Sequence, residues 1–92
     1  MDLPSFWVYV LYSLKDHQCY SGTTNGLVRR GDQHDRGETW STHWRRPLVL
    51  IYCEGHRSKI DARGRKKYLK TTKGRAMLKY ILRDSLEQLK NL

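Results

Sequence analysis

Four side chains early in the chain have the types and spacing to cut a phosphodiester. Tyr9 and Tyr20 are eleven positions apart, and Arg30 and His34 follow with one helical turn between them. A phenol can take a proton from an attacking water. A guanidinium grips two phosphate oxygens as a bidentate fork. An imidazole one turn from the arginine can orient either group. These four residues are therefore the candidate catalytic residues.

Three of the four also have an ordinary structural interpretation. A single Tyr9 is more often a core tyrosine with a satisfied hydroxyl. Arg30 is compatible with a surface arginine, and His34 with a helix-end histidine facing the helix dipole. Their order and spacing as a set favour the catalytic interpretation over three unrelated structural roles.

The elements that must position these residues begin with a hairpin. Residues 6–14 are rich in aromatic and β-branched side chains, which predicts a strand. Residues 15–18 are predicted as a turn and residues 19–23 as the returning strand, which keeps the two tyrosines close.

A helix is predicted next, from residue 26 to about residue 36, with Asn25 as its N-cap and Gly37 as its stop. Leu27, Arg30 and His34 share one face of this helix. We therefore expect Leu27 to point to the core and the other two to point to its edge, where the sheet lies.

The second half of the chain predicts a loop at 38–47, a strand at 48–53 with both faces covered, and two helices. Ser58 and Asp61 form a capping box for a helix that runs to about residue 70. Thr71 or Thr72 caps a last helix through Leu89. The apolar stripe of this last helix is Leu78, Ile81, Leu82, Leu86 and Leu89.

The expected fold is thus a single α+β domain over residues 1–92. It consists of a small, mainly antiparallel three-stranded sheet flanked by three helices, in the order β-β-α-β-α-α. Ninety-two residues leave no room for a second core.

Positive charge is concentrated late in the chain. The net charge is +9, and residues 57–83 alone hold eleven Lys or Arg against one acid, Asp61. A concentrated basic face is typical of nucleic-acid binding, although charge also keeps a solvated helix surface soluble. No segment resembles a signal peptide or a membrane span, so a cytoplasmic protein without a membrane partner is expected.

Two cysteines do not make a disulfide framework, so we expect both thiols to be free. His17, Cys19, Cys53 and His56 are a less favoured alternative, a structural zinc site with unusual spacing.

Beyond these residues, the chain resembles the GIY-YIG nuclease family, in its small stand-alone form. Val8-Tyr9-Val10 and Tyr20-Ser21-Gly22 are similar to the two tripeptides that name the family, and Leu27-x-x-Arg30-x-x-x-His34 is similar to its next block. Residues 45–52 and 65–71 resemble later blocks. The resemblance covers about residues 6 to 83.

The resemblance implies DNA cleavage with one Mg²⁺ or Mn²⁺. It implies that Tyr9 is the general base, that Tyr20 lines the site, and that Arg30 binds phosphate above His34. We further expect nucleic-acid contacts from basic side chains in the loop and the later helices, with no obvious protein partner. These are Arg45, Arg46, Lys67, Lys70, Lys73 and Arg75.

One position departs from the family. The block that usually reads Arg-Glu-x-Tyr-Leu-Lys has Lys66 in place of the glutamate that holds the metal. A positive charge there repels a divalent cation, so metal-dependent cleavage is expected to be impaired or lost. Lys66 also lies between Ala62 and Leu69 on one helix face, which directs its charge toward the sheet.

Alternative functions remain open from the sequence. A non-catalytic nucleic-acid-binding module would keep the fold and the basic face. A protein adaptor would use Trp40 and Trp44, which could equally stack on bases or fill the core. Direct contact of the Lys66 ammonium with the phosphate is a less favoured alternative, as is a rescue of the metal site by Glu54 or Asp61.

Overall fold

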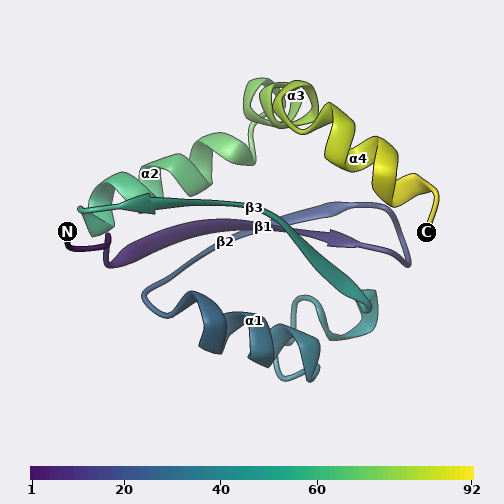
Figure 1. The fold of residues 1–92 in the computed structure, drawn as a ribbon, viewed down its shortest axis with the longest axis horizontal. Helices are drawn as coiled ribbons and strands as arrows, with labels where there is room; N and C mark the ends of the chain where they lie inside the picture. The colour runs from purple at the N-terminus through teal and green to yellow at the C-terminus, as the bar shows by residue number, and fades with distance from the viewer.

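The computed structural model describes all 92 residues and builds one antiparallel sheet in the order β2-β1-β3, with helices on both faces (Figure 1). The predicted α+β class and three-stranded sheet are confirmed, with one helix more than expected. The elements, in chain order, are β1 (Phe6–Ser13), β2 (Cys19–Thr24), α1 (Leu27–Asp35), the 3₁₀ helix η1 (His43–Arg45), β3 (Leu48–His56), α2 (Lys59–Leu69), α3 (Thr72–Ile81) and α4 (Arg83–Lys90).

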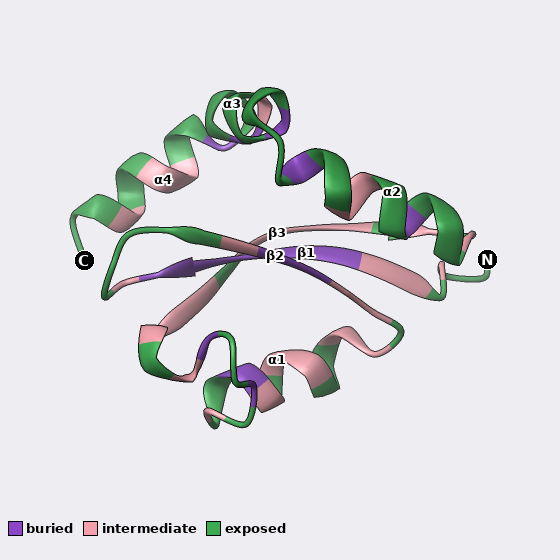
Figure 2. Cartoon of the chain, turned by 180° about the vertical axis from the view of Figure 1, so that it is seen from behind, coloured by how far each residue is buried: buried purple, intermediate pink, exposed green.

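The most apolar strand, β1, occupies the centre of the sheet and is buried along most of its length (Figure 2). Successive side chains on a strand point to opposite faces. Val8 and Val10 join the core under α2, α3 and α4, whereas Tyr9 points to the face that α1 covers. The main core cluster comprises Val8, Val10, Ala62, Leu69, Leu78 and Leu82.

The stop of α1 is as predicted, but its start is not. Gly37 adopts a φ of +76°, and the Gly37 and Glu38 amides donate to the carbonyls of His34 and Gln33, which closes the helix as a Schellman motif. At the other end Gly26 is the N-cap, and no side chain caps it. The predicted cap was wrong because the Asn25 carboxamide oxygen instead accepts a hydrogen bond from Arg29 Nη2 at 2.7 Å.

Leu27 was also expected in the core, but it is only partly buried and lies outside the core cluster. The buried residue of α1 is His34. The reason is that this helix packs on the sheet through a polar cluster instead of an apolar stripe.

The third strand was predicted with both faces covered, and this is wrong. β3 pairs only with β1, so it is an edge strand, and Leu50 is 48% exposed. The strand also continues to His56, beyond the predicted end. An apolar run does not distinguish a covered central strand from an edge strand, because that depends on which strands pair.

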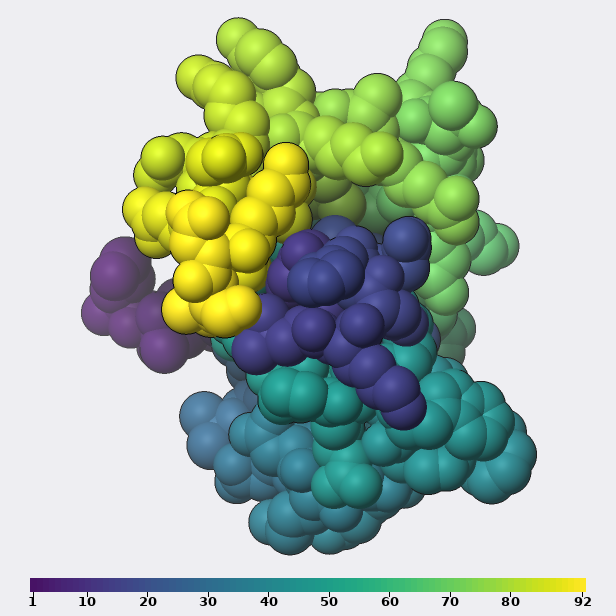
Figure 3. Space-filling view, turned by 90° about the vertical axis from the view of Figure 1, so that its right-hand side faces the viewer, coloured from purple at the N-terminus to yellow at the C-terminus, as the bar shows by residue number.

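The predicted last helix is divided at Leu82 into α3 and α4. Leu78 and Leu82 are buried on the sheet, Leu86 packs against the core, and Ile81 is 47% exposed, so its place in the predicted stripe was wrong. The bend lets α4 run beside the turn between β1 and β2 (Figures 1 and 3). The predicted caps are confirmed, since Ser58 accepts from the Asp61 amide and Thr71 from the Gly74 amide.

None of the helices has both the length and the apolar character that crossing a membrane requires.

Candidate active site

The two phenols lie on the same face of the sheet. Tyr9 is opposite Gly22 and Tyr20 is opposite Leu11, so the tyrosines are diagonal neighbours across β1 and β2. The His34 ring lies between them, with its centroid 5.5 Å from that of Tyr9 and 5.7 Å from that of Tyr20. The hairpin and α1 therefore bring three of the four predicted residues into contact.

A buried hydrogen-bonded chain connects the strand, the helix and the following loop. The Tyr9 hydroxyl is 2.9 Å from His34 Nε2, and His34 Nδ1 is 2.7 Å from Thr42 Oγ1. All three side chains are buried. Buried polar atoms with short, mutual partners are held in one geometry, so the imidazole orientation is fixed from both sides.

Arg30 completes the cluster from the more open side. Its Nε donates to the Tyr9 hydroxyl at 3.3 Å, and its Nη1 donates to Gln33 Oε1 at 2.9 Å. Arg30 and Tyr20 are both partly exposed, in contrast to Tyr9 and His34. Two contacts thus orient the guanidinium, and they use its Nε and Nη1 atoms.

Burial sets the charge states in this cluster. Desolvation raises the pKa of the Tyr9 phenol above its ordinary value, partly offset by the hydrogen bond and charge of Arg30. Desolvation also lowers the pKa of His34, and the Arg30 charge lowers it further. At neutral pH the pair is therefore a neutral phenol and a neutral imidazole joined by a hydrogen bond.

Gly22 is required by the same geometry. A Cβ placed on Gly22 would overlap the hydroxyl and the adjoining ring carbon of Tyr9. The Tyr9 ring can cross the second strand only where that strand carries no side chain. This gives a steric reason for the glycine that ends the Tyr20-Ser21-Gly22 tripeptide.

One cation at the end of α2 approaches Tyr20. Lys70 caps the C-terminus of α2, and its ammonium lies 5.9 Å from the centroid of the Tyr20 ring. Lys66 is one turn earlier on the same helix and is partly buried, as expected for a side chain between Ala62 and Leu69.

Glu54 and Asp61, the two carboxylates considered as alternative metal ligands, both lie away from the cluster. Glu54 accepts from Arg65 Nε at 2.7 Å and lies 3.6 Å from His56 Nε2. It is on β3, which is separated from β2 by the central strand. Asp61 is in the exposed first turn of α2. Rescue by either acid is therefore not supported.

The donors present do not fit the divalent cation that the family resemblance implies. Mg²⁺ needs oxygen ligands that include at least one carboxylate, and the cluster offers phenols, a guanidinium, an imidazole and ammonium groups. No three His, Cys, Asp or Glu side chains gather closely enough to hold a metal ion. The zinc alternative fails on the same ground, because Cys19 and Cys53 lie on strands on opposite sides of β1.

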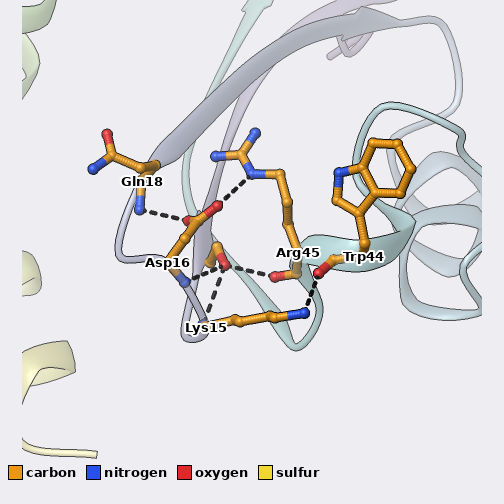
Figure 4. Close-up of polar contacts among 6 residues, drawn as sticks. Lys15, Asp16, Gln18, Trp44 and Arg45 are labelled. Atoms are coloured by element: carbon orange, nitrogen blue, oxygen red, sulfur yellow. Dashed lines mark hydrogen bonds and ion pairs between the residues drawn. The ribbon is translucent and has the colours of Figure 1, made fainter.

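Two predicted nucleic-acid contacts have partners within the chain. Arg45 Nε donates to Asp16 Oδ2 at 3.0 Å, which ties η1 to the turn between β1 and β2 (Figure 4). Arg46 donates to the carbonyls of His43 and Asp35 and fastens η1 to the end of α1. Both arginines therefore brace the loop that carries Thr42. The other four predicted contacts are exposed on or beside α2 and α3, namely Lys67, Lys70, Lys73 and Arg75.

Sequence reasoning missed Thr42 and Gln33. Gln33 is three residues after Arg30, a spacing at which helical side chains meet, so the helix pattern contained a signal for it. Thr42 is in a loop eight positions after His34. Nothing in the linear spacing indicates that contact, which depends on how the loop folds back.

The comparisons with known proteins agree with this architecture. A profile of the GIY-YIG catalytic domain matches residues 5–80. A UPF0213 protein of Limosilactobacillus reuteri (strain DSM 20016) is 35% identical over 93 residues, covering 98% of this chain and 96% of the relative. A UPF0213 protein of Staphylococcus haemolyticus (strain JCSC1435) is 36% identical over 76 residues, covering 82% and 92%.

The UPF0213 protein CPE1444 of Clostridium perfringens (strain 13 / Type A) is 32% identical over 83 residues, covering 89% of this chain and 88% of the relative. No solved structure matches the chain. The profile spans most of the sequence and includes both tyrosines, the arginine and the histidine of the cluster. The chain therefore belongs to the GIY-YIG family.

Proposed function

We propose that residues 1–92 act as one GIY-YIG-type DNA endonuclease domain whose metal-dependent hydrolysis is impaired by Lys66. The observation that carries the proposal is the buried Tyr9–His34 hydrogen bond with the Arg30 guanidinium against the same phenol. If Arg30 were only a surface arginine and Tyr9 only a core tyrosine, there would be no reason for Arg30 and His34 both to contact the Tyr9 hydroxyl.

In this proposal Arg30 binds the phosphate and Tyr9 handles a proton. The phenol donates its proton to the neutral Nε2 of His34 while its oxygen accepts the proton of the attacking water. In this proposal the imidazole is the Nδ1–H tautomer, which donates to Thr42 Oγ1 and leaves Nε2 to accept the phenol proton. Because Tyr9 has a raised pKa, the phenol needs this imidazole partner to act as a base.

Lys66 disfavours the remaining requirement for cleavage, a bound divalent cation. Stabilising extra negative charge on phosphorus accounts for much of the catalysis in phosphodiester cleavage, and the family supplies it with a divalent ion. An ammonium at the carboxylate position repels such an ion. It can still attract the phosphate, so DNA binding is retained while turnover is low.

The test is cleavage of supercoiled, branched and single-stranded DNA with Mg²⁺ or Mn²⁺, comparing the natural chain with Lys66→Glu. We expect cutting by the Glu variant and little by the natural chain. Arg30→Ala in the Glu background should abolish turnover, with the barrier raised by about 3 kcal/mol or more. Equal, robust cutting by both Lys66 forms would remove the metal argument.

A second candidate, a non-catalytic nucleic-acid-binding module, is favoured by one observation. The cluster contains no carboxylate, while the exposed faces of α2 and α3 are strongly basic. This candidate predicts salt-sensitive binding to DNA or RNA with no cutting by either Lys66 form. It also predicts only a modest loss of affinity for Arg30→Ala.

A further inference from the structure

A row of positive charge borders the β2 edge of the sheet. Lys59, Arg63, Lys66 and Lys70 follow one another at intervals of four, three and four residues, so they share one side of α2. None of the five ion pairs in the structure includes any of them. Their charges are therefore not neutralised within the chain.

Contacts at both ends show where this row lies. Lys59 and Arg63 line a pocket with Thr23 and Thr24, at the end of β2. Lys70, at the opposite end of the row, holds its ammonium over Tyr20, near the start of β2. The row thus follows β2, which has only β1 as a neighbour and leaves its outer edge open.

The pocket at the Thr24 end has a volume of about 230 Å³ and suits an anion. Two of its seven lining residues are cationic, three are neutral polar and none is acidic. Thr24 is occupied by the turn into α1, since its hydroxyl bonds both the amide and the carbonyl of Gly26. The lining residues are Phe6, Thr23, Thr24, Asn25, Lys59, Ala62 and Arg63.

We infer that this pocket binds a second phosphate of the nucleic-acid strand whose scissile phosphate lies at Arg30. The strand would run along the outer edge of β2, from the pocket past Lys66 to Lys70 at Tyr20. Cationic side chains of α2 would contact its phosphates along this path. Lysine and arginine side chains together with a threonine hydroxyl are the groups that bind phosphate oxygens in nucleic-acid complexes. The inference rests on the proposed function, because it takes the Arg30 cluster as a phosphodiester site.

The spacing along β2 sets the length of strand required. Tyr20 and the Thr23–Thr24 pair are three to four residues apart, which is about 10 to 13 Å along a strand. That distance is the axial rise of roughly three to four nucleotide steps in B-DNA. A strand shorter than this cannot contact both Lys70, whose ammonium lies over Tyr20, and the pocket.

The experiment measures binding of single-stranded oligonucleotides as a function of salt, for the natural chain and for Lys59→Gln/Arg63→Gln. We expect the slope of log K against log salt to fall by about 1.4 in magnitude, because each lost contact to a single strand contributes about 0.7. The difference should be smaller for a dinucleoside monophosphate, because its single phosphate can occupy the Arg30 site or the pocket but not both.

Arg83→Gln/Lys90→Gln is the matched control, because it removes the same charge from exposed positions on α4. A control slope reduced as much as that of the pocket variant would overturn the inference, since only net charge would matter. An unchanged slope for the pocket variant, with Arg30→Gln still lowering affinity, would overturn the inference and leave the proposed function standing. Absence of any nucleic-acid binding by the natural chain would overturn both. Thermal unfolding confirms that each variant is folded.

Discussion

Tyr9 and Gly22 face each other across β1 and β2, and the phenol occupies the space where a Cβ of residue 22 would be. We expect Gly22→Ala to displace the Tyr9 ring and break its hydrogen bond to His34. Overpacking of this kind costs about 1–3 kcal/mol. Urea unfolding measures the loss, and the NMR shift of the His34 ring reports the broken bond.

Gly31→Ala is the control for that substitution. Gly31 lies inside α1, and a Cβ there would meet nothing within 4 Å. Alanine at such a helix position stabilises by about 0.5–1 kcal/mol. A Gly22→Ala variant as stable as the natural chain, with the His34 signal unchanged, would contradict the proposed crossing of Tyr9 over β2.

Thr42 is predicted to act as a positioning residue through its contact with His34. Thr42→Val keeps the shape but leaves His34 Nδ1 buried without a partner, which costs about 1–3 kcal/mol of unfolding free energy. In the Lys66→Glu background it should also change the pH profile of cleavage, because the imidazole tautomer is no longer fixed. Urea unfolding and the pH dependence of kcat measure the two effects.

Thr39→Val is the control that separates the loss of the Thr42–His34 contact from the general effect of replacing a buried threonine by valine. The Thr39 hydroxyl is buried without a hydrogen-bond partner, so valine there removes an unsatisfied group. Its unfolding free energy should be unchanged within about 0.5 kcal/mol or slightly higher. Equal losses at the two threonines would mean that the His34 contact contributes nothing specific.

Stability should fall as the solution becomes mildly acidic. The folded pKa of His34 is lowered by burial, so below its unfolded value of about 6.5 the unfolded chain binds more protons than the folded chain. The free energy of unfolding therefore decreases from pH 7.5 to pH 5.5. Denaturation at several pH values should show this slope in the natural chain and a smaller one in His34→Gln. Parallel curves for the two chains would contradict it.

The loop tryptophans are predicted to respond to DNA. Trp40 and Trp44 are 75% and 53% exposed and are packed with His43 beside Thr42, so they do not fill the core. Bases stacking on exposed indoles contribute about 1–3 kcal/mol each. Single-stranded DNA should quench the tryptophan emission. Trp40→Leu/Trp44→Leu should remove that quenching and weaken binding, while the emission of the partly buried Trp7 remains. The same affinity in the double variant would exclude base stacking.

The hairpin, the polar face of α1 and the N-caps of α2 and α3 could be predicted from the sequence because they depend on neighbours a few residues apart. A period of two places Tyr9 and Tyr20 on one face of a hairpin once the turn is located. A spacing of four places Arg30 and His34 on one side of a helix. The departure expected at Lys66 also comes from the sequence, since it concerns a residue type at a motif position.

The tertiary structure alone decided the contacts between segments that lie far apart in the chain. The Thr42–His34 bond, the edge position of β3, the bend at Leu82 and the two internally paired arginines all depend on which elements pack together. Local patterns fix the direction of a side chain relative to its own helix or strand. The partner that this side chain meets depends on how distant segments fold back against one another, a choice made by the free energy of the whole packed chain.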